Sequence, residues 1–226
     1  MVSQDPVPGP PPVHWGEGAA GRRLWPRIAA LLEGRERVLI GIAGAPGAGK
    51  STVAQAVADE AQRHLPGQVA LVPMDGYHLA QTTIERRGRA GSKGAPDTFD
   101  APGYLALLER LRRADGETVY APEFRRELDD PVAAAVEVDP AVRVVVTEGN
   151  YLLLDTPPWS AVRPLLDEAW YVEVPEATRL ERLIARHVRF KDDPATARRR
   201  ALGSDQRNAE LVEASLARAD LVIVYA

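Results

Sequence analysis

The sequence predicts an α/β fold in which a doubly wound, mainly parallel sheet is flanked by helices. Short, continuous apolar runs, typical of strands buried on both faces, alternate with segments whose apolar residues recur at helical spacing. A glycine-rich segment at residues 44–51 also stands directly between the first such run and the next helical segment. Alternation of this kind joins parallel strands through right-handed helical crossovers.

The predicted elements follow one another from near residue 22 to the end of the chain. The first helix ends before Gly34, a residue that commonly terminates helices. In order, we expect helix Arg22–Leu32, strand Val38–Ala43, helix 50 to about 63, strand Val69–Met74, helix Tyr104–Ala114, strand Val142–Thr147, strand Ala169–Val174, helix Glu176–Val188, helix Asp205–Ala219 and strand Leu221–Tyr225.

Length and composition indicate one globular domain. The chain has 226 residues, 45% of them hydrophobic and 27% charged, and it has no cysteine, which excludes disulfides, thiolate catalysis and cysteine-ligated zinc. A net charge of −4 argues against a partner that is nucleic acid or an anionic membrane. Neither a leader segment nor a membrane-spanning apolar run is apparent, so we expect a cytoplasmic protein.

Two segments depart from the regular alternation. Residues 1–17 are a proline-rich arm, with five prolines between residues 5 and 12, and we expect a tail or a packed, extended segment before the domain at 18–226. Residues 76–103 are rich in Gly, Arg and Asp and are too long for an ordinary connection in a compact domain. We therefore interpret 76–103 as a substrate-binding insert.

The glycine-rich segment carries the most specific chemical signal. It matches the phosphate-loop pattern G-x-x-x-x-G-K-[ST] in full and lies between a predicted strand and a predicted helix. Inward-facing amides and the helix N-terminus would bind phosphates, Lys50 would reach the β- and γ-phosphates, and Ser51 would contact Mg²⁺. The expected ATP-binding residues are Gly44, Ala45, Pro46, Gly47, Ala48, Gly49, Lys50, Ser51 and Thr52.

A phosphate loop is compatible with a small-molecule kinase, a regulatory GTPase or a motor ATPase. The chain has only three lysines, Lys50, Lys93 and Lys191, and none lies in the N-K-x-D pattern that selects guanine in most switch GTPases. A motor ATPase is disfavoured because the chain is small and places a polar insert beside the expected phosphate site. We therefore expect a P-loop NTPase fold that serves a small-molecule kinase.

Such a kinase needs an acid or base near the acceptor hydroxyl, and Asp75 follows the second strand at the sheet edge where ligands bind. The segment 73–78, PMDGYH, resembles the phosphoribulokinase, uridine kinase and pantothenate kinase group. The resemblance implies that Asp75 is the catalytic base, with Tyr77 and His78 as candidate substrate residues. The alternative for Asp75 is a turn cap, and for His78 a polar loop residue.

The resemblance continues from about residue 38 to the end of the chain. Residues 93–100, KGAPDTFD, resemble the acceptor-pocket segment of uridine kinase-like proteins, which implies that Asp97 contacts substrate hydroxyls; a solvated turn is the alternative. Residues 122–126, PEFRR, resemble a substrate-contacting segment, which makes Phe124, Arg125 and Arg126 candidates alongside a strand-and-turn role. The Tyr-Asp and His-x-Arg pattern of a true uridine kinase is absent, which weakens the uridine assignment.

Glu148 ends the strand-like run that precedes Gly149. In phosphate-loop enzymes a carboxylate at this place orients Mg²⁺ opposite the Ser or Thr of the loop, so Glu148 and Ser51 are the expected metal residues. A solvent-facing carboxylate at a strand end is the alternative. Because parallel strands end at one edge, the phosphate loop, Asp75 and Glu148 are expected to share a cleft.

A basic stripe along the predicted helix 176–188 completes the candidate site. Arginines recur there at spacings of three and four, which usually indicates a solvated helix face. Kinases also close a basic lid over the transferred phosphate, and the group's lid helix lies at this place. We expect a helical lid at about 176–201, with Arg186 and Arg189 as catalytic residues.

The sequence thus predicts an ATP- and Mg²⁺-dependent kinase that transfers phosphate to a hydroxyl of a small metabolite, a nucleoside or a sugar first and pantothenate second. The alternative from another class is a nucleotide-binding regulatory ATPase without a small-molecule acceptor. The resemblance leaves a homodimer open.

Overall fold

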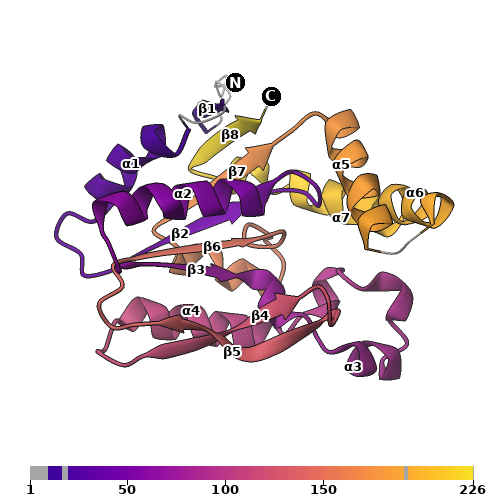
Figure 1. Ribbon diagram of the computed structural model, residues 1–226, viewed down its shortest axis with the longest axis horizontal. Coiled ribbons are helices and arrows are strands. Elements are labelled where there is room, and N and C mark those ends of the chain that lie inside the picture. The colour runs from indigo at the N-terminus through magenta and orange to yellow at the C-terminus, as the bar shows by residue number, and fades with distance from the viewer. Residues whose placement is uncertain (1–9, 17–19, 191–192, 226) are drawn as a thin grey trace, which may run out of the picture.

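The central sheet of the computed structural model has six strands, and the structure describes residues 10–16, 20–190 and 193–225. Every pair of neighbouring strands in this sheet is parallel. The predicted α/β class is confirmed (Figure 1). In spatial order the strands are β1 (Pro12–Trp15), β8 (Leu221–Tyr225), β7 (Glu168–Glu173), β2 (Val38–Ala43), β6 (Val144–Gly149) and β3 (Val69–Pro73).

Helices cover both faces of the sheet because alternate strand residues point to opposite sides. On one face, α1 (Ala20–Leu31) and α2 (Lys50–His64) pack over a core that includes Ile40 of β2. On the other face, α4 (Ala101–Arg113) packs over a core that includes Leu39, the preceding residue of the same strand. Figure 1 shows α2 and α4 on opposite sides of the sheet.

The predicted strands lie within two residues of the observed ones, and β2 and β8 have the predicted bounds. The predicted helix 205–219 is shorter in the structure. It begins one residue earlier, as α7 (Ser204–Glu213), and a separate 3₁₀ turn follows at Leu216–Arg218. Between them Ser215 donates its hydroxyl to the Val212 carbonyl at 2.6 Å, a side-chain bond of the type that competes with helical continuation.

A β-hairpin outside the main sheet was not predicted as such. It consists of the antiparallel strands β4 (Val119–Arg125) and β5 (Asp130–Val138). The hairpin packs directly on the turn that follows β3, where a Cβ added to Gly76 would lie 2.1 Å from the Pro122 carbonyl oxygen. Only glycine allows this approach, so the hairpin is fixed beside Asp75.

The predicted insert at 76–103 contains the short helix α3 (Gln81–Arg86) and several 3₁₀ turns. An isolated antiparallel bridge between His78 and Phe99 joins the start of the insert to its last part. Its last residues belong to α4, which Asp100 caps by accepting a hydrogen bond from the Gly103 amide at 3.0 Å.

Three helices form the C-terminal side of the molecule, at the right of Figure 1. The predicted lid segment at about 176–201 contains α5 (Glu176–Arg189) and most of α6 (Pro194–Leu202), and its residues 191 and 192 lie outside the described residues. Asp193 caps α6 by accepting from the amides of Ala195 and Thr196, both at 3.0 Å.

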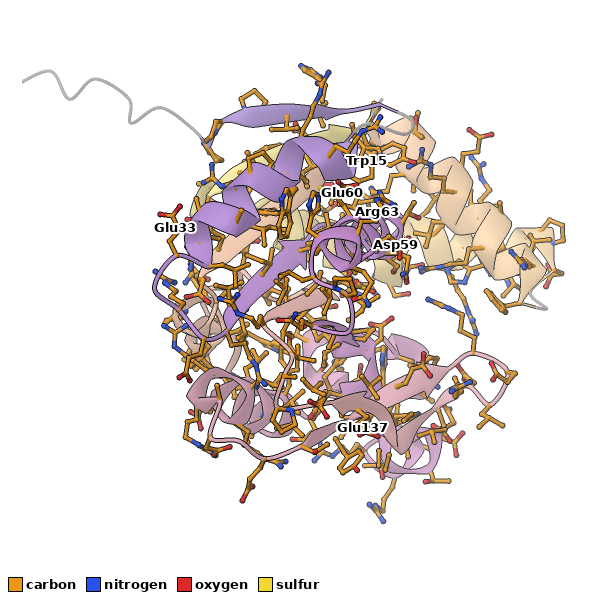
Figure 2. All side chains as sticks on the ribbon, turned by 60° about the vertical axis from the view of Figure 1, so that its left-hand side comes forward. Trp15, Glu33, Asp59, Glu60, Arg63 and Glu137 are labelled. Carbon is orange, nitrogen blue, oxygen red and sulfur yellow. The ribbon has the colours of Figure 1, made fainter. Side chains whose placement is uncertain are left out.

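The predicted proline-rich arm forms the edge strand β1 where it is described, and its residues 1–9 and 17 lie outside the described residues. β1 pairs with β8, and the Trp15 ring stacks on Tyr225 with centroids 6.3 Å apart. In Figure 2, Trp15 lies in the upper part of the view, and Glu137 of the hairpin lies in the lower part. No helix within 10–16, 20–190 and 193–225 has the length and apolar character that crossing a membrane requires.

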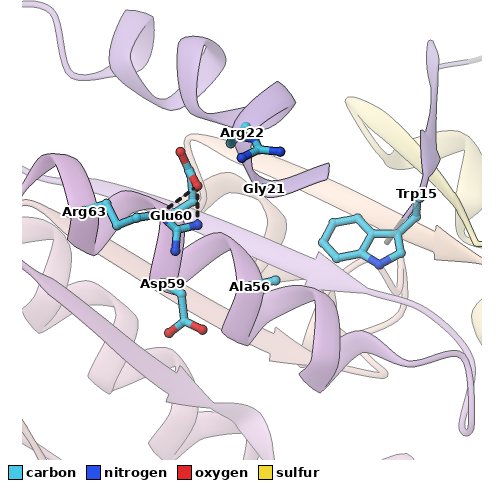
Figure 3. A pocket seen from close by; sticks show the side chains of 8 residues that line it. Trp15, Gly21, Arg22, Ala56, Asp59, Glu60 and Arg63 are labelled. Carbon is cyan, nitrogen blue, oxygen red and sulfur yellow. Dashed lines mark hydrogen bonds and ion pairs between the residues drawn. The ribbon is translucent and has the colours of Figure 1, made fainter. Parts of the chain in front are cut away.

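A small pocket of about 140 Å³ lies between the arm, α1 and α2. Figure 3 shows that Glu60 and Arg63 in its wall are bonded to one another, and Glu60 also contacts His64 at 3.2 Å. The phosphate loop contributes no residue to this pocket.

Candidate active site

The phosphate loop connects the end of β2 to the start of α2. Gly47 and Gly49 have φ angles of 85° and 95°, which glycine adopts at little cost. A Cβ at Gly47 would also lie 2.8 Å from the Arg179 carbonyl oxygen, so the loop fits closely against α5. The α2 N-terminus points its free amides into the loop, which makes this turn suited to bind phosphate.

Lys50 is the first residue of α2 and only 9% of it is exposed. Its Nζ donates to the Ala45 carbonyl at 3.2 Å, which folds the side chain back over the loop. Burial lowers the pKa of Lys50, although the charges of Glu148 and Asp75 oppose the shift. A lysine in this position gains from an anion that replaces its lost hydration.

Ser51, in the first turn of α2, meets Glu148, near the end of β6. The Ser51 hydroxyl donates to Glu148 Oε1 at 2.8 Å. Glu148 is 6% exposed, and burial together with the nearby Asp75 charge raises the pKa of its carboxyl above the usual range. A buried carboxylate and a hydroxyl in contact offer hard oxygen donors, and Mg²⁺ is bound by one or two such groups with phosphates and waters completing its shell.

The donor set fits a magnesium ion that shares its ligands with a nucleotide. In the described part of the chain no group of three or more His, Asp or Glu residues is arranged to hold a metal by itself. A metal ion that binds together with nucleotide phosphates needs only one or two donors from the protein.

Asp75 lies beyond the end of β3 and faces the same edge. Pro73 pairs with Glu148 in the sheet, so the two carboxyl groups project from neighbouring strands. The Asp75 side chain is 34% exposed, in contrast to Glu148. His78 makes a hydrogen bond through Nδ1 to the Asp75 carbonyl at 2.8 Å, and burial lowers the pKa of His78.

A cleft of about 810 Å³ joins these groups. The expected active-site residues that line it come from the phosphate loop, the β3 and β6 ends, the hairpin and α5. They are Pro46, Lys50, Ser51, Asp75, His78, Phe124, Arg126, Glu148, Arg186 and Arg189.

The other predicted loop residues lie in or beside the phosphate loop without lining the cleft. Gly44, Ala45 and Ala48 are buried, and Gly47 and Gly49 are half-buried. Thr52 lies in the first turn of α2.

The α5 arginines differ in their surroundings. Arg186 and Arg189 line the cleft, and their role in a lid stays a prediction. Arg182 instead stacks on Tyr225, with its guanidinium 4.4 Å from the ring centroid. Arg179 is 1% exposed, and it donates through Nη2 to Gln206, which joins α5 to α7.

Three predicted substrate residues lie outside the cleft, which corrects their expected placement. Tyr77 packs edge-on against Tyr104 in the core, with centroids 5.4 Å apart, and burial raises its pKa to about 12. Asp97 is exposed and bonded to Arg89 at 2.8 Å. Arg125 is bonded to Glu123 at 2.7 Å. The core or a neighbouring charge satisfies each of these side chains.

The structure adds residues whose role sequence reasoning did not find. Lys93 reaches from the insert to the hairpin turn and donates to the Asp129 carboxylate at 2.7 Å. His187 of α5 contacts Asp205 of α7 at 2.7 Å. Each of these residues lines the cleft. Their partners are 36 and 18 residues away, so no local pattern reveals the pairs.

Hydrogen bonds from side chains of other segments hold the insert in place beside the cleft. The Gly94 carbonyl accepts from Asn208 Nδ2 at 3.2 Å and from the Tyr151 hydroxyl. Trp159 donates through Nε1 to the Pro96 carbonyl at 3.3 Å. Three side chains from distant segments therefore fix the loop that follows Lys93.

Comparisons with known proteins identify a family model and relatives that match this chain. A family model described as the Phosphoribulokinase / Uridine kinase family matches residues 39–197. The Schizosaccharomyces pombe protein named "Putative uridine kinase C227.14" is 36% identical over 171 residues, 73% of this chain and 72% of that protein. The pantothenate kinase of Bradyrhizobium sp. (strain BTAi1) is 29% identical over 183 residues, 76% of this chain and 57% of that protein.

A solved structure shares the whole arrangement. The crystal structure of a "putative fructose transport system kinase" from Silicibacter sp. TM1040 superposes with a TM-score of 0.82 at 38% identity. The alignment covers 91% of this chain and 99% of that protein.

Proposed function

The chain belongs to the phosphoribulokinase / uridine kinase family and is an ATP-binding kinase, and from this premise we propose that it phosphorylates a hydroxyl group of a small metabolite. The acceptor class we put first is a nucleoside or a sugar. The relatives named for uridine and fructose support that choice. Pantothenate is the second candidate, on the relative of that name.

The phosphate loop and Lys50 bind the nucleotide. The loop amides and the α2 N-terminus bind the phosphate oxygens, and the Lys50 ammonium lies among them with little water of its own. Ser51 and Glu148 hold Mg²⁺ through their oxygens. When bound, Mg²⁺ offsets negative charge on the phosphates and orients them.

Asp75 accepts the proton of the acceptor hydroxyl. As the hydroxyl oxygen forms its bond to the γ-phosphorus, the bond from that phosphorus to the β–γ bridging oxygen breaks and ADP leaves with the electron pair. Asp75 suits the role of base because it is partly exposed and lines the cleft with Lys50. Glu148, which is buried against Ser51, suits the metal instead.

Arg186 and Arg189 stabilise the charge of the transferred group. Both come from α5, on the opposite side of the cleft from the hairpin, and both line it. Fixed guanidinium groups at this place stabilise charge that spreads over the γ-phosphate oxygens during transfer.

The observation that carries the proposal is the convergence of three strand ends. Asp75 after β3, Glu148 at β6 and the phosphate loop after β2 line one cleft. An ATPase also needs a group that orients the attacking water. The cleft, however, continues past Asp75 to the hairpin and the insert, which leaves room for a second substrate beside the nucleotide.

The test is ATP consumption in the presence of nucleosides, sugars and pantothenate, with each product identified by mass. An acceptor should raise the rate above its basal value, and Asp75→Asn should lower the acceptor-dependent rate about 10²- to 10⁴-fold. Asp155→Asn is the control, because Asp155 is exposed and lies outside the cleft.

Two results would count against the proposal. If nothing in the panel stimulates ATP consumption, the regulatory ATPase is favoured. If Asp75→Asn keeps the full acceptor-dependent rate, Asp75 is not the base.

A further inference from the structure

The tip of the β4–β5 hairpin presents a positive charge to the cleft. Arg125 and Arg126 are adjacent at the turn, and both are exposed. Arg125 pairs with Glu123 at 2.7 Å and lies 3.9 Å from Glu127. Arg126 lines the cleft, and no carboxylate of the described residues lies within ion-pair distance of it.

Four of the five carboxylates that line the cleft are already engaged. Asp129 binds Lys93 at 2.7 Å, Asp205 contacts His187 at 2.7 Å, and Glu148 accepts from Ser51 at 2.8 Å. Glu127 lies beside Arg125. The fifth, Asp75, is the proposed base, and it does not lie within ion-pair distance of Arg126 in the described part of the chain.

Arg126 instead lies beside the end of α5. Its guanidinium carbon lies 5.6 Å from the centroid of the Phe190 ring, at the C-terminal end of α5. Arg186, one turn earlier on α5, also lines the cleft without a carboxylate partner among the described residues. Burial lowers the pKa of Arg186, and the charge of Arg126 lowers it further. An arginine that has no carboxylate partner in the described residues, and that shares a cleft with other cationic side chains, attracts an anion.

Arg126 belongs to the hairpin beside Asp75, so the anion that it attracts belongs to the acceptor rather than to the nucleotide. The hairpin packs on the turn that carries Asp75, where Pro122 approaches Gly76. Within the same strand, the Phe124 ring lies 4.8 Å from the His78 ring. The nucleotide phosphates have the loop amides, Lys50 and the lid arginines as partners, so Arg126 is left for the second substrate.

We propose that the acceptor carries an anionic group, a carboxylate or a phosphate, in addition to the hydroxyl that is phosphorylated, and that Arg126 binds this group. The inference rests on the proposed kinase function. Within that function it favours sugar phosphates, sugar acids and other hydroxy acids, pantothenate among them, over neutral nucleosides and sugars. A guanidinium binds either oxyanion through paired N–H donors.

The first experiment compares acceptors with one carbon skeleton and different charge. Ribose, ribonate and ribose 5-phosphate form one set, glycerol, glycerate and glycerol 3-phosphate a second, and pantothenol and pantothenate a third. In at least one set the neutral compound should be a much poorer acceptor than a charged one. Whether the carboxylate or the phosphate member is used tells the two anions apart.

The second experiment uses Arg126→Gln with the best anionic acceptor. The KM for the acceptor should rise about 10- to 100-fold, the value expected when a hydrogen bond to a charged group is lost, while the KM for ATP stays near that of the wild type. Arg126→Lys should recover part of the loss, because it restores charge without the paired donors. Arg125→Gln is the matched control, since its guanidinium is turned to Glu123 outside the cleft.

The outcomes distinguish a failure of the proposed anion site from a failure of the proposed kinase function. If neutral acceptors are phosphorylated as well as their charged counterparts, or if Arg126→Gln and Arg125→Gln change the acceptor KM equally, the anion site is wrong and the kinase stands. If no acceptor of either charge stimulates ATP consumption, the proposed function itself fails.

Discussion

Glu148, the proposed metal ligand, is a residue whose burial lowers the stability of the fold at neutral pH. Its carboxyl is buried beside Ser51 at the end of β6, and its pKa is raised above the usual range, chiefly by burial. A group with a raised pKa in the folded state binds protons more readily there than in the unfolded chain. The contribution of the Glu148 carboxyl to the free energy of unfolding is therefore fully present at low pH. It is lost as the pH rises through the pKa that this carboxyl has in the folded state.

The Glu148→Gln variant should consequently be more stable than the wild type at neutral pH without ligand. The difference in free energy of unfolding should increase with pH from about the ordinary value of 4.5. Urea denaturation at several pH values measures it, and each 1 kcal/mol corresponds to about 2–4 °C in Tm for a chain of this size. The variant should also lose Mg²⁺-dependent phosphoryl transfer.

Glu117→Gln is the control for this effect, because Glu117 is exposed. If Glu148→Gln has the same pH-independent effect as Glu117→Gln, the buried carboxylate does not destabilise the fold.

The site residues that could be predicted from sequence are those fixed by a local motif. Lys50 and Ser51 follow from the phosphate-loop spacing, and Asp75 and Glu148 from their places at strand ends. Arg125 and Arg126 could not be distinguished. Their different directions depend on Glu123 and on the course of the hairpin turn, neither of which any spacing encodes.

At the scale of elements, the contact between the hairpin and the β3 turn depends on Gly76. The Pro122 carbonyl oxygen would lie 2.1 Å from a Cβ at this position and its carbonyl carbon 2.6 Å, so backbone would have to move. Gly76 is also buried, which leaves the turn little room to shift. The hairpin can therefore pack beside Asp75 only because position 76 has no side chain.

Gly76→Ala should lower the free energy of unfolding by about 1–3 kcal/mol, the usual cost of overpacking. It should also raise the acceptor KM, because the hairpin is pushed from Asp75. Gly91→Ala in the same insert meets no atom within 4 Å and should change stability little. Urea denaturation of the two variants checks the difference, and equal stability of both would contradict the close packing.

The hairpin itself was missed for reasons of composition. β4 contains Pro122, which lacks an amide donor, and β5 contains the run Ala133–Ala135, a residue type with low strand propensity. Ala134 even adopts a φ of 54°. Pairing with each other and packing on the Asp75 turn stabilise these strands, and both are tertiary effects.

At the scale of the molecule, the arm closes one edge of the sheet. β1 pairs with β8, and the Val222 amide donates to the Pro11 carbonyl at 3.0 Å. Tyr225 lies between Trp15 and Arg182, so the arm is connected through stacked rings to α5. Edge strands left unpaired invite association with other chains.

Deletion of residues 1–16 should lower stability by about 1–3 kcal/mol and increase aggregation, because the edge of β8 is uncovered. Thermal denaturation and light scattering measure both effects. Deletion of residues 1–9 leaves β1 in place and is the comparison. If the two deletions behave alike, pairing with β1 contributes nothing to the fold.

The fold as a whole was predictable because its strands are buried on both faces. Val38–Ala43 and Val144–Gly149 are buried at every position, which appears in the sequence as continuous apolar runs. β1 is half-exposed and proline-rich, so the sequence indicated an extended arm without showing that it joins the sheet.

The register of β3 against β6 places Asp75 and Glu148 at the same edge of the sheet. Pro73 lies opposite Glu148, and Asp75 follows two residues later. Neighbouring strands keep a spacing of about 4.7–4.9 Å that the backbone alone determines. The pairing thus fixes where the proposed base and the proposed metal ligand leave the sheet, while the hairpin and the insert lie outside this sheet. Changes in those two segments alone can therefore alter which acceptor binds, and the residues proposed for phosphoryl transfer stay in place.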